Sequence, residues 1–380
     1  MMGSACAFSA QPTPFPMMAH PPATSRCFRS APSFGRDHRV ASFLWALLVL
    51  VWCVGCSAPT GPREAAAVPV YFATTRAIVE NAPSPDASFG PRASDPQIVR
   101  YGRATVEIGP KPRITSYDPP LAGNPGLLPG RFETELRNQI SSAHPLIVYV
   151  HGFNNTFATA AHRAAIFAHE LQPDAAERPA IYSWASASKL LKYSKDEETA
   201  LLNQENIRRF LTGLHRGDVT TPAILIGHSM GARALTYALR DIFLIRAGQL
   251  DPRRPMFAHL VLLEPDVNRL YFRQNLVRTR ALCGHVTVYA SSRDHALGLS
   301  DFLHDYERLG QVDSSLAGKI DVIDASAVRS DIFGHSYDRP VLFEDIRALI
   351  RGKSMTEREN HTLERDSVKG YYRLLPAPRA

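Results

Sequence analysis

The chain has 380 residues, of which 45% are hydrophobic and 21% are charged, the balance of an ordinary globular protein. Its net charge of +7 at pH 7 is small for this length. Three of the seven charges come from the first 55 residues, so composition gives no reason to expect nucleic-acid binding. Of the five cysteines only Cys283 lies beyond residue 56, which excludes an internal disulfide framework and a cysteine-based metal site.

The N-terminal segment has the composition of a leader. Residues 1–39 are rich in Pro, Ser, Ala and Met without periodicity, and they are compatible with a start assigned too far upstream. Arg36 and Arg39 precede an apolar run at residues 40–54. Its fifteen residues fit the apolar region of a signal peptide better than a membrane span of about 20 residues. We therefore assign residues 1–55 to a leader and residues 56–67 to a linker.

The end of this apolar run resembles a bacterial lipobox. In Cys53-Val-Gly-Cys56-Ser57 a small residue precedes Cys56, which would be lipidated and become the first residue of the mature chain. Ser57 follows it, and no aspartate stands there to retain the protein in an inner membrane. The sequence predicts an exported, lipid-anchored protein of the bacterial cell envelope, on the outer membrane where the cell has two. An uncleaved signal anchor is the alternative.

The first strands expected after the linker are separated by loops rich in Pro and Gly. Residues 68–74 predict a strand, and its early proline, Pro69, favours a place at the sheet edge. Residues 103–108 alternate in polarity and predict a second strand. Residues 77–100 and 110–130 are expected to be loops.

From residue 146 onward, predicted strands and helices alternate. A continuous apolar run at residues 146–150 predicts a parallel strand buried on both faces. Further strands are expected at residues 179–184, 223–226, 257–263, 286–290 and 319–323. Helices are expected at residues 159–171, 189–216, 232–247 and 268–282, and from about residue 341. This alternation predicts an α/β fold with a doubly wound, mostly parallel sheet flanked by helices. We expect one domain at residues 68–350 and a basic, flexible tail at residues 351–380.

The segment Gly227-His-Ser229-Met-Gly231 joins a predicted strand to the helix that follows it. G-x-S-x-G in this context is the signature of a nucleophile elbow, a strained turn that lifts a serine hydroxyl clear of the backbone. Glycine is needed at both ends because a side chain there would collide with the neighbouring strand and helix. We therefore predict that Ser229 is a catalytic nucleophile.

Two backbone N–H groups are expected to receive the negative charge that forms on a carbonyl oxygen under attack. Met230, the residue after the nucleophile, supplies the first of them at the N-terminus of a helix. The His-Gly pair that ends the strand at residues 146–150 matches a loop of α/β-hydrolases that supplies the second. Phe153 is the predicted donor in this loop, and Asn154 is the alternative.

The catalytic acid and base are expected after Ser229, because triads of this fold run Ser, then Asp or Glu, then His along the chain. Asp294 follows the second strand after the elbow and is the preferred acid. Asp266, at the end of the first strand after the elbow, is the alternative acid, although its position also suits a helix N-cap. His335 lies in the last long loop before the final helix and is the preferred base.

Five segments together resemble bacterial α/β-hydrolases of largely undefined activity within the esterase/lipase superfamily. They are VYFATTR at residues 70–76, VHGFNN at 150–155, GHSMG at 227–231, YASSRDHAL at 289–297 and GHS at 334–336. The resemblance covers roughly residues 68–350. It implies a Ser–Asp–His hydrolase with Ser229, Asp294 and His335, and it names no substrate. Arg76, in the first segment, would bind either a substrate anion or, as we prefer, a structural ion-pair partner.

These residues predict a serine hydrolase that cleaves small-molecule or lipid carboxylic esters through an acyl-enzyme intermediate, without a metal or an organic cofactor. Cleavage of an amide or a thioester would use the same residues. The remaining alternative is a non-catalytic envelope lipoprotein that uses the hydrolase fold as a binding scaffold.

Overall fold

The structure is a computed structural model of the chain. It describes residues 66–93, 95, 98–109, 111–117, 122–125, 130–140, 145–171, 179–187, 193–215, 221–251, 253–291, 307–312, 314–327 and 340–376. Three predicted site residues, Cys56, Asp294 and His335, lie outside this part of the chain, as do the leader and most of the linker. Among the described residues, no helix has both the length and the apolar character needed to span a bilayer.

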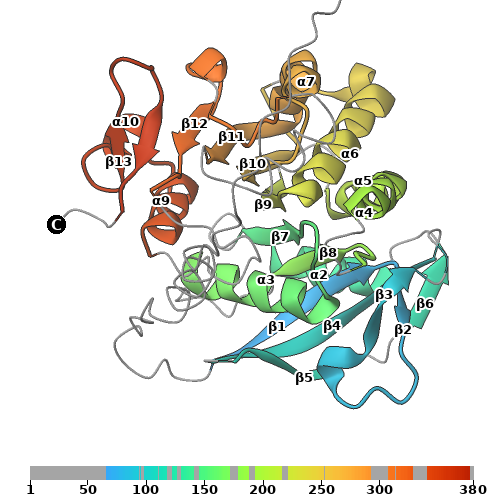
Figure 1. The fold of residues 1–380 in the computed structure, drawn as a ribbon. Helices are drawn as coiled ribbons and strands as arrows, with labels where there is room; N and C mark the ends of the chain where they lie inside the picture. Colours follow the sequence, from blue (N-terminus) through green and yellow to red (C-terminus); the bar gives the residue numbers. More distant parts are fainter. Residues whose placement is uncertain are drawn as a thin grey trace, which may run out of the picture. The chain divides into compact units, whose positions relative to one another are not determined.

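A 12-stranded sheet forms the centre of the fold, and its middle is parallel (Figure 1). In order across the sheet, the parallel strands are β12 (Asp321–Asp324), β11 (Cys283–Ala290), β10 (Phe257–Leu263), β9 (Thr221–His228), β7 (Leu146–Val150), β8 (Ala180–Ser183) and β1 (Ala66–Thr74). Every residue of β7 and β8 is buried, as expected for strands covered on both faces. The predicted α/β fold with a doubly wound, mostly parallel sheet is confirmed.

Helices cover both faces of this sheet and create two separate cores. The core on one face includes α3 (Phe157–Leu171) and α9 (Pro340–Ile350). The core on the other face includes α2 (Gly130–Gln139), α4 (Tyr193–Leu202), α5 (Gln204–Leu214), α6 (Met230–Arg246) and α7 (Arg269–Leu282). The buried face of α3 is rich in alanine, and these small side chains let the helix lie close to the sheet.

β1 is an interior strand, so the edge position predicted from Pro69 is wrong. β1 pairs along its whole length with the antiparallel strand β4 (Ile98–Ile108), whereas β8 pairs only with residues 71–74. The Tyr71 N–H points to the β8 side, where it donates to Pro179 O at 2.8 Å. Alternation along the strand places the nitrogen of Pro69 on that same side, beyond the end of β8, so its missing N–H breaks no ladder hydrogen bond.

The regions predicted as loops around β4 contain short strands. β5 (Arg113–Tyr117) and β6 (Ala122–Pro125) both pair antiparallel with β4. β2 (Arg76–Ile78) and β3 (Phe89–Ala93) form a separate two-stranded sheet. Proline and glycine within β3 and β6 conceal these two strands in the sequence, because they break the alternation of polar and apolar residues.

Residues after α9 extend the sheet, so the prediction of a flexible tail from residue 351 is wrong for residues 354–374. After α10 (Met355–Arg358), β13 (Leu363–Arg365) pairs antiparallel with β14 (Tyr372–Leu374), which lies parallel to β12. Arg358 is 1% exposed and lies 2.9 Å from a carboxylate oxygen of Asp345 and 2.9 Å from one of Asp321. These buried ion pairs join the C-terminal segment to α9 and β12, because separating them would leave charged groups without partners.

The chain reverses its direction across the sheet at β7. β8 is added on one side of β7, whereas β9, β10, β11 and β12 are added in turn on the other side. At such a switch point the loops that leave the carboxyl ends of the two adjacent strands diverge, and open α/β sheets bind their ligands there. The strands that flank this point are β7, followed by the His151-Gly152 loop, and β9, followed by Ser229.

Candidate active site

Ser229 lies between β9 and α6 with a backbone conformation that is rare outside glycine. Its φ is 49° and its ψ is −122°. Such strain persists only where neighbouring groups hold it. The Ser229 N–H donates to Leu263 O at 3.0 Å, and the Ser229 carbonyl accepts from the N–H groups of Ala232 at 3.0 Å and Asp266 at 3.2 Å. This is the strained strand–turn–helix geometry that the G-x-S-x-G pattern predicts.

Three glycines allow the backbone to pass closely around Ser229. A Cβ added at Gly231 would lie 2.2 Å from the carbonyl oxygen of His151, and one added at Gly227 would lie 2.8 Å from the backbone of α6. A Cβ added at Gly152 would lie 2.9 Å from the Cβ of Ser229. The loop after β7 and the elbow therefore touch each other, and the contact exists because these side chains are absent.

Both predicted oxyanion donors lie at this contact. Met230 is the first residue of α6, where an N–H has no acceptor within the helix and the helix dipole is positive. In the facing loop, the side-chain amide of Asn155 donates to Gly152 O at 3.1 Å and to Phe153 O at 2.8 Å. Because a trans peptide places its N–H opposite its carbonyl, these two bonds turn the N–H groups of Phe153 and Asn154 away from Asn155.

His151 belongs to the scaffold of this loop. Its buried ring stacks on Trp184 with centroids 4.9 Å apart. Its Nδ1 lies 2.8 Å from Gly152 O, and its Nε2 lies 3.1 Å from Trp184 O. Burial lowers the pKa of His151 well below its usual range, and the charge of Arg76 lowers it further. The ring is therefore neutral near pH 7, and its single N–H donates to one of these two carbonyls.

Arg76 is completely buried and binds the backbone of the same loop. Its guanidinium donates to three backbone carbonyls and one hydroxyl. These acceptors are Asn155 O at 2.6 Å, Gly90 O at 3.2 Å, Ser186 O at 3.4 Å and Ser183 Oγ at 3.0 Å. Burial lowers the pKa of Arg76 to about 9, although the nearby charge of Asp196 opposes this shift. The direct partners of Arg76 are thus mainly carbonyl oxygens rather than the ion-pair partner expected from the sequence.

Asp266, the alternative acid, lies beside the elbow in a buried group of charges that we call the Asp266 cluster. Its Oδ1 lies 2.8 Å from Arg233 and 3.3 Å from Arg308, and its Oδ2 accepts a hydrogen bond from the Tyr193 hydroxyl. Arg233 also pairs with Glu197 of α4. Burial alone would lower the pKa of Arg233, but Asp266, Tyr193 and Glu197 outweigh it and raise that pKa. Both oxygens of Asp266 therefore have partners that are not histidines.

Sequence reasoning missed three residues that hold the site together: Asn155, Tyr193 and Arg233. Asn155 is the last residue of the VHGFNN segment and Arg233 lies two residues after GHSMG, so both motifs were usable signals. No sequence pattern around Tyr193 predicts its role, because its contacts depend on how α4 packs. Its ring meets that of Phe153 edge-on with centroids 5.4 Å apart, while its hydroxyl binds Asp266.

The predicted acid and base follow strand ends at the same edge of the sheet as Ser229. β11 ends at Ala290 and β12 at Asp324, and these two residues are partners in the parallel ladder. Asp294 and His335 come after these ends along the chain and lie outside the described residues. The structure thus brings Ser229, Met230 and Phe153 together, and the acid and base stay predictions.

A protein family described as alpha/beta hydrolase of unknown function (DUF900) matches residues 129–340, more than half of the chain. The matched range contains the elbow, the loop after β7 and positions 294 and 335. No curated protein matches the chain.

Gly231→Ala is expected to destabilise the protein by about 1–3 kcal/mol, because overpacking at a rigid site forces the backbone to shift. The added Cβ would lie 2.2 Å from His151 O and 2.4 Å from Val150 O. Urea unfolding followed by circular dichroism measures the change. Gly248→Ala is the matched control, since nothing lies within 4 Å of a Cβ there, and it should change stability by less than about 0.5 kcal/mol. Equal unfolding free energies for both variants would contradict the close contact around the elbow.

Proposed function

This chain belongs to that family of α/β-hydrolases, and we propose that it is a serine hydrolase that cleaves carboxylic esters. The observation that carries the proposal is the strained backbone of Ser229, packed against the Gly152 loop. A non-glycine residue at positive φ costs on the order of 1–3 kcal/mol and is retained where it serves a function. Exposure of a nucleophile beside two oxyanion donors is such a function.

In the proposed reaction Ser229 Oγ attacks the ester carbonyl while His335 takes the hydroxyl proton. Asp294 holds the imidazole in the required tautomer and stabilises the imidazolium. The N–H groups of Met230 and Phe153 donate to the oxyanion, and each such donor contributes roughly 3 kcal/mol in the transition state. His335 then protonates the leaving alcohol as the carbon–oxygen bond breaks. Water, activated by the same histidine, releases the acid from Ser229.

The described histidines near Ser229 support the choice of His335 by exclusion. A general base that works near neutral pH needs a pKa near that pH. Burial lowers the pKa of His228 to about 3, with a further contribution from Arg163, and it lowers the pKa of His151 well below its usual range. Both rings are therefore neutral near pH 7, and their low pKa values make them weak proton acceptors and so poor general bases.

The contacts of Asp266 favour Asp294 as the acid. A catalytic aspartate must accept a hydrogen bond from its histidine, and the Asp266 carboxylate already binds Arg233, Arg308 and Tyr193. We therefore assign Asp266 to the support of the elbow.

Ser229→Ala is expected to abolish labelling by a fluorophosphonate probe. It should also lower the hydrolysis of a short-chain p-nitrophenyl ester at least about 1,000-fold, because no other group forms the acyl-enzyme. Probe labelling on gels and steady-state rates measure this, and urea unfolding checks that the variant is folded. Equal labelling of variant and wild type would exclude Ser229 as the nucleophile. Absence of labelling in the wild type would favour the non-catalytic scaffold. Matched ester, amide and thioester substrates decide which bond is preferred.

Asp294→Asn is expected to lose activity, whereas Asp266→Asn is expected to lose stability. Asp294→Asn should lower kcat by about 10⁴-fold through the wrong histidine tautomer and leave the unfolding free energy unchanged. Asp266→Asn should cost about 3–5 kcal/mol of stability, because it removes a carboxylate that binds two buried guanidinium groups, those of Arg233 and Arg308. The two measurements are steady-state kinetics and urea unfolding. A stable Asp266→Asn variant without activity, beside an active Asp294→Asn variant, would reverse the assignment.

We propose, from the leader sequence, that the protein is exported, cleaved before Cys56 and anchored to a membrane by acyl chains on that residue. Expression of the full-length chain with radiolabelled palmitate should label the wild type and leave Cys56→Ala unlabelled. Equal labelling of both proteins, or of neither, would exclude the lipoprotein and favour a signal anchor.

A further inference from the structure

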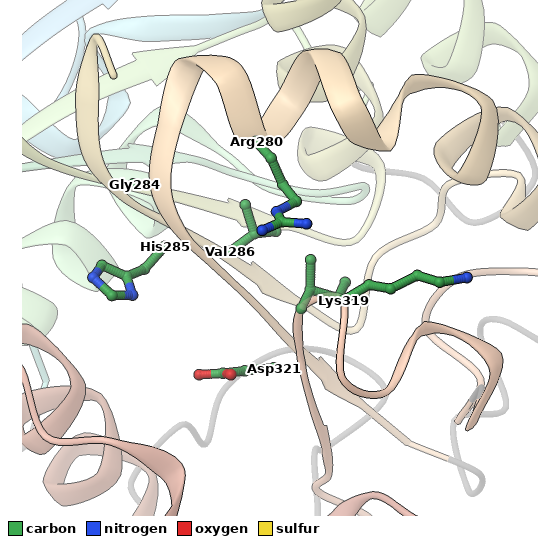
Figure 2. Close-up of a pocket in the computed structure, with 7 residues that line it drawn as sticks. Arg280, Gly284, His285, Val286, Lys319 and Asp321 are labelled. Atoms are coloured by element: carbon green, nitrogen blue, oxygen red, sulfur yellow. The ribbon is translucent and has the colours of Figure 1, made fainter. Parts of the chain in front are cut away.

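A cavity of about 160 Å³ lies at the amino-terminal edge of the sheet, the edge opposite Ser229 (Figure 2). Its lining comes from the last turn of α7, the start of β11 and the residues that lead into β12. Val286 and Ile320 are its buried apolar residues. Because parallel strands all begin at this edge, the cavity is separated from the proposed active site by the length of the strands.

Three basic side chains from three elements surround this cavity. Arg280 comes from α7, His285 from β11 and Lys319 from the turn before β12. Figure 2 shows the Arg280 guanidinium pointing from the helix toward the start of β12, with His285 on one side and the extended Lys319 on the other. Within the described part of the chain, Arg280 and Lys319 have no carboxylate partner.

The acidic residue of the lining shares its cationic partner with a second carboxylate. Asp321 lies 2.9 Å from the guanidinium of Arg358, which is 1% exposed and also binds Asp345. The C-terminal end of α7 carries a partial negative charge, and one cation in the last turn, here Arg280, offsets it. The lining itself carries three basic side chains and one carboxylate, so basic groups outnumber acidic groups around the cavity.

The ring next to His285 is buried. His259 stacks on His285 with centroids 5.1 Å apart and is 8% exposed. The pKa of His259 is lowered to about 4, first by burial and then by the charges of His285 and Arg358. His259 therefore adds no positive charge beside the cavity near pH 7.

We propose that this cavity binds a phosphate group. A cavity needs about 10–15 Å³ to hold one water, so one of about 160 Å³ has room for a tetrahedral oxyanion and its waters. Arginine binds phosphate oxygens through its forked donors and lysine binds them as a point charge. The Arg280 guanidinium lies between His285 and Lys319 (Figure 2), and its several N–H donors suit an anion with several acceptor oxygens. The group belongs either to a soluble phosphate ester or to a phospholipid headgroup.

The test measures binding of a soluble phosphate ester and of lipid vesicles to the full-length chain, both at the same ionic strength. Glycerol 3-phosphate is titrated by isothermal calorimetry, and cosedimentation is measured with vesicles of phosphatidylglycerol and of phosphatidylcholine. Arg280→Gln and Lys319→Gln should each weaken binding at least about tenfold. Arg273→Gln is the matched control, because this exposed arginine lies on the same helix outside the cavity and loses the same charge. It should bind within about twofold of the wild type.

If the wild type binds glycerol 3-phosphate and Arg280→Gln binds it more weakly, a soluble phosphate ester is a sufficient ligand for the cavity. Dependence on Arg280 seen only with phosphatidylglycerol vesicles identifies the lipid headgroup. Failure of the wild type in both arms overturns the proposal, as does an equal loss in Arg273→Gln and Arg280→Gln, which marks nonspecific charge attraction. Circular dichroism of each variant confirms that it is folded. Because ester hydrolysis is not measured, the result is independent of the proposed function.

Discussion

The candidate site depends on the positive φ of Ser229. An L-residue adopts this conformation only where its surroundings compensate for the strain, and hydrogen bonds from three directions hold the Ser229 peptide groups here. The turn is tight enough that Gly227 and Gly231 must lack side chains, and the facing loop must offer Gly152. The position of the proposed oxyanion donors follows, because the same contacts that permit the turn bring the loop after β7 against it.

Buried charges hold the loops around this turn. Arg76, two residues after β1, ties the loop after β7 to the end of β8 by donating to Asn155 O and to the hydroxyl of Ser183. The Asp266 cluster ties α4 to the start of α6 and to the residue that follows β10. A buried guanidinium is tolerated only when its donors are satisfied, so each of these arginines restricts several segments at once. The hydrophobic cores set the distance between sheet and helices, and the charges set where the loops lie.

The parallel sheet separates the two proposed sites. Strand ends that carry Ser229 and the loop after β7 meet at the carboxyl edge, whereas the basic cavity of Arg280, His285 and Lys319 lies where the strands begin. The C-terminal extension contributes to this second region, because Arg358 pairs with Asp321 there. A group bound at the amino edge would therefore leave the carboxyl edge open to a substrate.

Local pattern is enough to predict some features of the fold and the site. The apolar runs at β7, β9 and β10 reflect burial on both faces, and Gly227 of the G-x-S-x-G pattern avoids a collision with Ala232, five residues later. The packed fold accounts for the rest: the contact of Gly231 with His151, the interior position of β1, the packing of residues 354–374, the scaffold role of Arg76 and the partners of Asp266. Each of these depends on contacts between segments far apart in the chain: whether β8 extends past Pro69, whether Arg358 meets Asp321, and whether α4 brings Tyr193 to Asp266. Local residue preferences do not specify such contacts, because they arise when the helices and strands pack together.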